Sequence, residues 1–199
     1  LENYIDPTYV DQASPFKGTV FKTFIDPFVG KISYIYITHG SISKDKEVFN
    51  LRTGNKEKIS NIYTIRGGEL IELQEANAGD IIVVTKVAGL ATGDTISLNK
   101  DAEVELEIHF PKPQIYFAIA PKNKNDEDKM ANVLTRLVGE DPTLHYYRNN
   151  ETHQALIGGQ GELHIKTLVN KMKDKFGIEV SLDDLKVPYR ETIKGSSDV

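Results

Sequence analysis

The residues of this sequence that could do chemistry are a few carboxylates and imidazoles. They are three consecutive acids and three histidines: Asp126, Glu127, Asp128, His145, His153 and His164. The acids could bind a metal ion, but acidic side chains in the first turn of a helix complement the helix dipole, which is the more common use. For the histidines, a role on the surface or in packing is more common than a role as metal ligands. We therefore predict no catalytic residue, no metal site and no bound cofactor in this chain.

Catalytic sequence motifs are equally scarce. The sequence has no G-x-x-x-x-G-K-[ST] phosphate loop, no G-x-S-x-G, no H-E-x-x-H and no EF-hand. Residues 123–126 fit N-K-x-D, which GTPases use to bind guanine. They precede a helical pattern, so we expect Asn125 and Asp126 to begin that helix by pairing with free N–H groups. We predict that this segment binds no guanine nucleotide.

A glycine-rich corner stands out at residues 156–165. Gly158, Gly159 and Gly161 lie between an apolar run and a helical pattern that starts with Glu162 and His164. The start of a helix presents unpaired N–H groups and the positive end of its dipole, so the corner could hold an anion or a partner loop. The alternative is a tight strand-to-helix connection in which the glycines serve conformation alone.

The elements around this corner alternate in type. Strands are predicted at residues 115–120 and 178–182 and in a hairpin of residues 144–148 and 152–157. One helical stripe ends at Gly139, and a second ends at Gly177. The order is βαββαβ, which predicts a ferredoxin-like α+β domain with two helices on one face of an antiparallel sheet.

The first half of the chain has strand patterns without a helical period. Strands are expected at residues 16–25, 31–38, 46–51, 58–65, 81–87 and 95–98, separated by glycine turns. This pattern favours a closed barrel or sandwich. Residues 102–113 are expected to form an edge strand that leads into a connector. The predicted organisation is a linker at 1–14, an all-β barrel at 15–101, the α+β domain at 102–194 and a tail at 195–199.

Composition narrows the class of protein. The chain has 199 residues, 39% of them hydrophobic and 27% charged, with a net charge of −5 and no cysteine. Both halves are net negative, which disfavours binding to free nucleic acid, including DNA. No apolar run approaches the roughly 18 residues of a membrane span, and no leader peptide is seen. We expect a cytoplasmic protein without a membrane partner; because it begins at Leu1, we expect an excised fragment.

Particular motifs add a family resemblance. In the first half they are Asp26-Pro27-Phe28-Val29-Gly30-Lys31, Ala78-Gly79-Asp80-Ile81 and Thr92-Gly93-Asp94-Thr95. In the second half they are Phe110-Pro111-Lys112-Pro113, Glu140-Asp141-Pro142-Thr143, Gly161-Glu162-Leu163-His164 and Val187-Pro188-Tyr189-Arg190-Glu191-Thr192-Ile193. In this order they resemble the second domain, a translation-factor β-barrel, and the third, ferredoxin-like domain of elongation factor G.

The resemblance implies a part of a ribosomal translocase that hydrolyses GTP. The GTPase domain, with its GTP and Mg²⁺, would precede Leu1, so this chain would hold none of the hydrolytic residues. The implied partners are the ribosome, through small-subunit ribosomal RNA and a small-subunit ribosomal protein, and the protein's own GTPase domain. The residues implied to face the GTPase switches are Asp141, Pro142, Thr143, Gly161, Glu162, Leu163 and His164.

Two departures keep alternatives open. Gly159-Gln160-Gly161 replaces the usual Gly-Met-Gly, and residues 66–70 lack a charged run, so a paralogue of elongation factor G is implied. Thr152-His153 resembles the tetracycline-resistance ribosomal protection proteins. Because a fold does not fix a function, a small-molecule sensor and a structural scaffold also remain.

Overall fold

The computed structural model describes residues 11–26, 29–105, 107–189 and 191. Two compact units form, one of Leu1–Phe110 with Gly139–Pro142 and one of Pro111–Val138 with Thr143–Val199. Most of the expected 1–14 linker and all of the 195–199 tail lie outside the described residues. So do Pro27 and Phe28, and Arg190, Thr192 and Ile193 of the final motif at residues 187–193.

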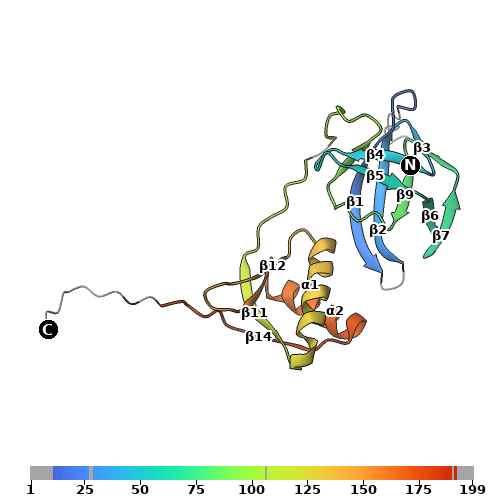
Figure 1. Cartoon of the computed structure of the whole chain (residues 1–199). Coiled ribbons are helices and arrows are strands. Elements are labelled where there is room, and N and C mark those ends of the chain that lie inside the picture. Colours follow the sequence, from blue (N-terminus) through green and yellow to red (C-terminus); the bar gives the residue numbers. More distant parts are fainter. Residues whose placement is uncertain (1–10, 27–28, 106, 190, 192–199) are drawn as a thin grey trace, which may run out of the picture. The chain divides into compact units, whose positions relative to one another are not determined.

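The first unit is built from one curled sheet and one small one (Figure 1). The large sheet has the order β5-β4-β10-β1-β2-β9-β6-β7, and β3 pairs with β8. The strands are β1 (Lys17–Asp26), β2 (Gly30–His39), β3 (Ser41–Ser43), β4 (Lys46–Asn50), β5 (Lys56–Ile59), β6 (Ile62–Arg66), β7 (Glu69–Leu73), β8 (Glu75–Asn77), β9 (Ile81–Thr85) and β10 (Thr95–Ser97).

The core of this unit follows from strand alternation. In β2, Ile35 and Ile37 are fully buried, whereas Tyr34 and Tyr36 beside them are less completely buried. Successive side chains of a strand point to opposite faces, so one row of each strand enters the core. Ile42 of β3 joins the same core, which places the small sheet against it. The predicted all-β barrel is confirmed, although no pairing joins the edge strands β5 and β7 among the described residues.

Three details of the expected strands are wrong. The run 58–65 is two strands, β5 and β6, which end and begin on either side of Ser60 and Asn61. The short strands β3, β7 and β8 were not expected. Residues 102–113 form no strand in their described part. Two prolines lack the N–H that a ladder requires, and the contacts of Glu105 with β1 and β10 involve side chains instead of a backbone ladder.

A buried carboxylate fastens the end of the barrel. Asp94 is 1% exposed and accepts hydrogen bonds from Asn50 Nδ2 (2.6 Å), from the backbone N–H of Ala91 (2.8 Å) and from the Arg52 guanidinium. Charge-assisted bonds of this kind are stronger than neutral ones. The carboxylate therefore ties β4 and the following turn to the loop that precedes β10.

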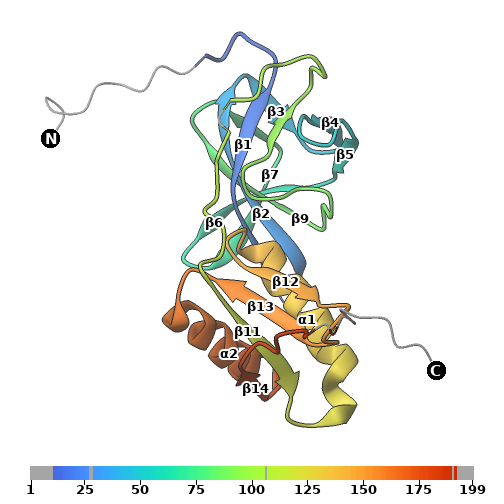
Figure 2. The ribbon, with the colours of Figure 1, turned by 90° about the vertical axis from the view of Figure 1, so that its left-hand side faces the viewer.

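The second unit has the predicted βαββαβ order. Its elements are β11 (Ile115–Pro121), α1 (Glu127–Glu140), β12 (His145–Arg148), β13 (Ala155–Gly159), α2 (Glu162–Phe176) and β14 (Val180–Asp183). The sheet has the order β12-β13-β11-β14, and every neighbouring pair is antiparallel. Figure 2 shows these strands together with both helices. The predicted ferredoxin-like domain is confirmed, although the last two residues of α1, Gly139 and Glu140, group with the first unit.

The start of the first helical segment differs from the expectation. Asn123, not Asn125, is the capping residue: its Oδ1 accepts the backbone N–H of Asn125 at 3.2 Å. Lys124–Asp126 form a 3₁₀ turn, and α1 follows from Glu127. The helix also continues through Gly139, which was expected to end it. By contrast, α2 ends as predicted, because Gly177 takes the left-handed conformation (φ 63°).

The sheet of this unit has one face packed against the helices. Ile119, Tyr146 and Ile157 belong to the same core as Leu134 of α1 and Ile165 of α2. The residues between them therefore point to the opposite side, which we call the helix-free face. Its residues are Tyr116, Ala118, His145, Tyr147, Leu156 and Gly158.

The chain after β14 is attached to the sheet by one side chain. Gln154 Nε2 donates to the carbonyl oxygen of Asp184 at 3.2 Å, and its Oε1 accepts the backbone N–H of Lys186 at 2.9 Å. The amide therefore offers the same donor and acceptor as a peptide group. Leu185 lies between the two bonded residues and is 46% exposed.

Candidate functional site

The residues implied to face the GTPase switches fall in two places. Asp141 and Pro142 follow α1 and group with the first unit, whereas Thr143 and residues 161–164 belong to the second. Asp141, Pro142 and Thr143 are all half-buried and form a turn before β12. The corner between β13 and α2 carries most of the candidate residues.

The three glycines of this corner have different surroundings. A Cβ on Gly158 would lie 2.4 Å from Cε1 of Tyr116, and one on Gly159 would lie 2.7 Å from Cδ1 of Ile165. Both distances are shorter than any ordinary carbon–carbon contact. Gly158 and Gly159 are therefore required by packing, and neither has the positive φ that a purely conformational role for these glycines would need.

Gly161 is required by neither packing nor backbone conformation. A Cβ there would meet nothing within 4 Å, and its φ of 177° is an extended value that any residue adopts. It is the residue before α2, and it supplies no side-chain hydrogen bond to the helix start. Serine or aspartate would cap this helix better. The fold therefore gives no reason for a glycine here, and the small residue leaves the helix start accessible.

The three side chains at the start of α2 differ in exposure and in their partners. Leu163 is 77% exposed, Glu162 pairs with Lys166 (Oε1–Nζ 2.7 Å), and His164 Nδ1 accepts the backbone N–H of Gln160 at 3.2 Å. Because Nδ1 is the acceptor, the neutral imidazole carries its proton on Nε2. His164 thus holds the corner together from inside while Leu163 faces outward.

The negative charge of Glu162 is stabilised by Lys166, which lies one turn further along the same helix. The hydrogen bond from the Lys166 ammonium, with its positive charge, lowers the pKa of the Glu162 carboxyl below its ordinary value. Glu162 is therefore anionic at neutral pH. An exposed leucine beside a carboxylate favours contact with a protein loop over binding of a free anion.

The helical pattern of the sequence itself sets Leu163 apart from the apolar stripe of α2. The buried stripe of α2 is Ile165, Leu168 and Met172. Leu163 is two residues before Ile165, which places it on the far side of the helix from that stripe. A large apolar residue off the apolar stripe is itself an indication of a contact surface.

The other candidate residues do not assemble into a chemical site. No group of three or more histidine, cysteine or acidic side chains that could hold a metal ion occurs within the part of the chain that is described. The N-K-x-D residues 123–126 form the capped 3₁₀ turn before α1. Asp126 donates its backbone N–H to the Asn123 carbonyl, so these residues serve the helix start.

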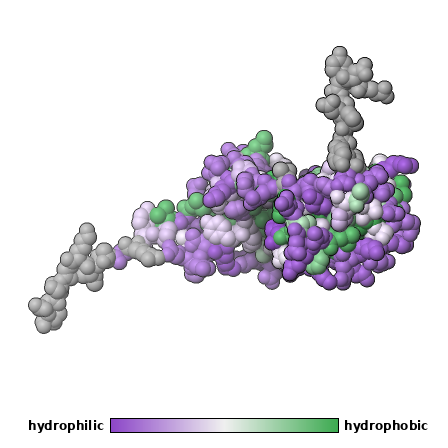
Figure 3. Space-filling view, turned by 90° about the horizontal axis from the view of Figure 1, so that it is seen from above, coloured by the Kyte–Doolittle hydropathy of each residue, from purple (hydrophilic) through white to green (hydrophobic). Residues whose placement is uncertain are grey.

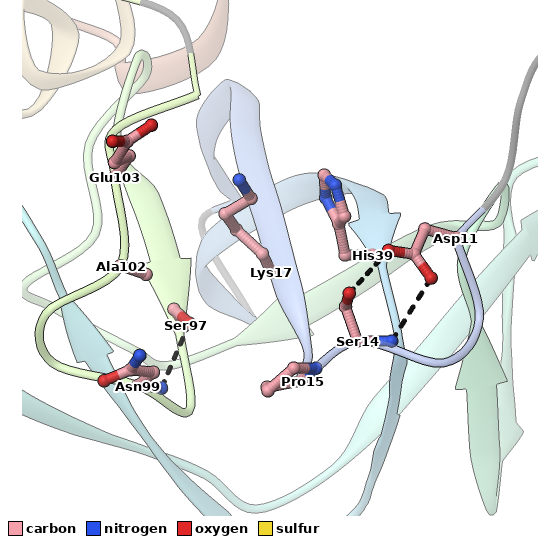
Figure 4. Close-up of a pocket in the computed structure, with 9 residues that line it drawn as sticks. All are labelled: Asp11, Ser14, Pro15, Lys17, His39, Ser97, Asn99, Ala102 and Glu103. Atoms are coloured by element: carbon pink, nitrogen blue, oxygen red, sulfur yellow. Dashed lines mark hydrogen bonds between the residues drawn. The ribbon is translucent and has the colours of Figure 1, made fainter.

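A polar cavity of about 290 Å³ lies in the first unit (Figure 4). Its lining includes Asp11, Ser14, Lys17 and His39. The Ser14 hydroxyl donates to Asp11 Oδ2, and Lys17 forms an ion pair with Glu105. His39 Nδ1 lies 3.0 Å from the Thr38 hydroxyl. Each of these groups thus has a partner, Ser14 in Asp11, Lys17 in Glu105 and His39 in Thr38, so they are not arranged as a catalytic set within the ranges described.

The surface seen in Figure 3 is mainly hydrophilic, with small hydrophobic patches. None of the helices in the described ranges is long and apolar enough to cross a membrane.

Comparisons with known proteins agree with the geometry of both units. Residues 15–99 match the family model "Elongation factor G domain 2", and residues 110–184 match "Elongation Factor G, domain III". Elongation factor G of Ureaplasma urealyticum serovar 10 is 37% identical over 188 residues, which are 94% of this chain and 27% of that protein.

A solved structure gives the same result. A crystal structure of a Thermus thermophilus protein superimposes with a TM-score of 0.79 at 33% identity, and the match covers 91% of this chain and 27% of that one. This chain therefore spans about a quarter of the length of each of these relatives. The curled barrel and the ferredoxin-like unit correspond to domain 2 and domain III of elongation factor G, and the chain belongs to the elongation factor G family.

Proposed function

We propose that this chain is the ribosome-docking and switch-relaying part of an elongation factor G-like translocase. The GTP, the Mg²⁺ and the hydrolytic residues would belong to a GTPase domain outside this sequence. The barrel would contact small-subunit ribosomal RNA, and the second unit would contact the GTPase switches and a small-subunit ribosomal protein. The whole protein would act in the cytoplasm, where ribosomes are found.

The observation that carries this proposal is the exposed start of α2. Leu163 is 77% exposed beside a glycine, Gly161, that the fold does not require. An apolar side chain on an accessible helix start suits a loop that must approach closely and leave again. A switch loop that changes with the bound nucleotide is such a partner. Asp141, Pro142 and Thr143 are proposed to contribute to the same role.

The test uses the full-length protein and its ribosome-stimulated GTP hydrolysis. Leu163→Ala and Glu162→Gln should lower that rate, because each removes a contact with the switches. Leu185→Ala is the matched control, since it removes an exposed leucine from the same unit outside the corner. Hydrolysis by the protein without ribosomes should be unchanged in all three variants. Equal rates for Leu163→Ala and Leu185→Ala would contradict the role of the corner.

The alternatives predict different results. A ribosomal protection protein would release tetracycline from ribosomes, and a small-molecule sensor would be stabilised by a metabolite without ribosomes. The matched models and the named relative are elongation factor G, which favours translocation over both. Measured movement of messenger RNA by the full-length protein would separate translocation from protection.

A further inference from the structure

The chain enters and leaves the barrel beside one histidine. Residues between Asp11 and Lys17 line one part of the polar cavity, and residues between Ser97 and Glu103 line another. His39, the last residue of β2, lines the same cavity. In Figure 4 the His39 ring is seen between the side chains of Asp11 and Lys17. A residue in this position can contact two segments that are far apart in the sequence.

The entering segment is packed tightly against the end of β2. The carbonyl oxygen of Asp11 accepts the backbone N–H of Gly40 at 2.7 Å, and Asp11 forms an isolated bridge with His39. The Asp11 carboxylate accepts the backbone N–H of Ala13 at 3.0 Å and the Ser14 hydroxyl. A Cβ on Gly40 would lie 2.3 Å from the carbonyl oxygen of Ser14, so glycine is needed there. We call residues 11–14 the entry turn.

The leaving segment is held by Glu105. Its backbone N–H donates to the Thr95 hydroxyl at 3.2 Å, and its carboxylate forms an ion pair with Lys17 of β1. Glu105 Oε2 also lies 3.9 Å from His39 Nδ1. Glu105 belongs to residues 102–110, which precede the second unit in the sequence and which we call the connector. Its contacts therefore fasten the start of the connector to the barrel.

A chain of hydrogen bonds orients the His39 ring. The Thr38 hydroxyl donates to the carbonyl oxygen of Lys17 at 3.1 Å, and His39 Nδ1 lies 3.0 Å from the same hydroxyl oxygen. A hydroxyl has only one proton to donate, so Nδ1 is the donor in its bond with Thr38. Neutral His39 therefore carries its proton on Nδ1 and takes a second proton on Nε2. The bond to Thr38 is the same in both charge states.

The surroundings of His39 hold more carboxylates than cations. The charged groups that face its ring are Asp11 of the entry turn, Glu103 and Glu105 of the connector, and Lys17 of β1. A proton on His39 adds a second cation close to both segments. The His39 side chain is 30% exposed, so solvent screens this charge only in part.

We propose that protonation of His39 tightens the hold of the barrel on the entry turn and on the connector at the same time. The imidazolium attracts the carboxylates of Asp11 and Glu105, whereas the neutral ring does not. The pKa of the Asp11 carboxyl is lowered, first by the hydrogen bond from Ser14 and also by the charge of His39. Histidine ordinarily changes its charge between about pH 5 and 8. The added stabilisation is present while His39 is protonated and is lost as the pH rises and the proton leaves.

The test measures the exchange of single backbone amides with water by NMR in the 199-residue chain, corrected for the intrinsic rate at each pH. The Gly40 amide reports on the entry turn, and the Glu105 amide reports on the connector, because each donates across the contact. Both should be about two- to fivefold better protected at about pH 6 than at about pH 8, as partly exposed ion pairs allow. The amides of β9 are the reference, since no residue of this fully described strand lines the cavity.

Two variants separate His39 from the other histidine–carboxylate pair of the connector. His39→Gln keeps a donor for Thr38 but takes up no proton, so the difference in protection between the two pH values should disappear. His109→Gln is the matched control, because His109 lies 3.9 Å from Glu107 and both side chains are at least 80% exposed. This variant should keep the full difference.

Glu105→Gln tests the two segments separately. It should remove the pH difference at the amide of residue 105 and leave the difference at Gly40, because Asp11 still faces His39. Equal protection at both pH values in the parent chain overturns the proposal, and so does an undiminished difference in His39→Gln or an equal loss in His109→Gln. The first of these results needs no variant, so it remains decisive if a substitution impairs folding. None of them bears on the corner between β13 and α2, whose role is measured by GTP hydrolysis.

Discussion

Replacing each glycine of the corner by alanine should change the free energy of unfolding by a different amount, because the three glycines have different surroundings. In Gly159→Ala the new methyl would lie 2.7 Å from Cδ1 of Ile165 and 3.2 Å from Nδ1 of His164. The first distance is about 1 Å shorter than a favourable carbon–carbon contact. Ile165 is fully buried and cannot turn aside. Overpacking of this kind costs about 1 to 3 kcal/mol, and we expect about 2 kcal/mol here.

Gly161→Ala should be nearly neutral by the same reasoning. The methyl would meet nothing, and alanine would restrict the unfolded chain, which stabilises by about 0.4 to 1 kcal/mol. Alanine is a poorer residue than glycine before a helix, by roughly several tenths of a kcal/mol or more. The two effects oppose each other, so the net change should stay within about 0.5 kcal/mol. Gly158→Ala should also be costly, because the new methyl would come within 2.4 Å to 2.9 Å of three atoms of the rigid Tyr116 ring.

Urea unfolding followed by far-ultraviolet circular dichroism measures these differences. Both α-helices of the described residues lie almost entirely in the second unit, so helical ellipticity reports on that unit. A loss of about 2 kcal/mol in a unit of this size lowers the melting temperature by roughly 10 °C. If Gly161→Ala costs as much as Gly159→Ala, the packing explanation is refuted and the corner needs glycine for another reason.

The remaining predictions concern buried charge, acid stability and nucleotide binding. Asp94→Ala should destabilise the first unit by about 3 kcal/mol, because it leaves buried donors without an acceptor; hydrogen exchange of β1 and β2 measures this, and exposed Asp101→Ala is the control. Glu179 accepts hydrogen bonds from two lysines that lower its pKa, so its contribution is present above about pH 4.3 and is lost as pH falls through the lowered value. Glu179→Gln should flatten the acid loss of stability, and an unchanged pH profile would contradict the assignment. Titration of the chain with a fluorescent GDP analogue and Mg²⁺ should give no saturable signal; saturable binding would show that residues 123–126 do more than begin a helix.

The second unit could be predicted almost completely because its signals are local. The stripes of α1 and α2 and the glycines that separate the elements give the βαββαβ order directly. The predicted start of the first helix differs from the observed one because Asn123 and Asn125 are both good capping residues. Only the structure shows that Asn123 is the one that accepts the backbone hydrogen bond. Local patterns therefore fix the type of each element better than its boundaries.

The first unit was harder because strand pairing is not local. Residues 102–113 alternate acids with apolar side chains, which is a strand pattern, but a strand also needs a backbone ladder with a neighbouring strand, and the described part of this segment joins none. β7 was missed because Glu69 and Glu72 interrupt its apolar residues, and it is an edge strand whose exposed face tolerates charge. At the corner, the sequence predicts where the helix starts, but only the structure shows that Gly159 is closely packed whereas Gly161 has no close contact.

The amide of Gln154 has a consequence for how the segment after β14 can vary. It binds only main-chain atoms of Asp184 and Lys186, so these hydrogen bonds depend on the backbone conformation of the segment and not on its side chains. Glutamate at 154 would set a carboxylate oxygen against the carbonyl of Asp184, whereas substitutions at 184–186 other than proline at 186 would leave both bonds intact. A mutational scan should therefore find that substitutions of Gln154, just before β13, are poorly tolerated, whereas most substitutions at residues 184–186 are tolerated. Under natural drift this segment can acquire a new surface chemistry while it keeps the direction in which it leaves the sheet.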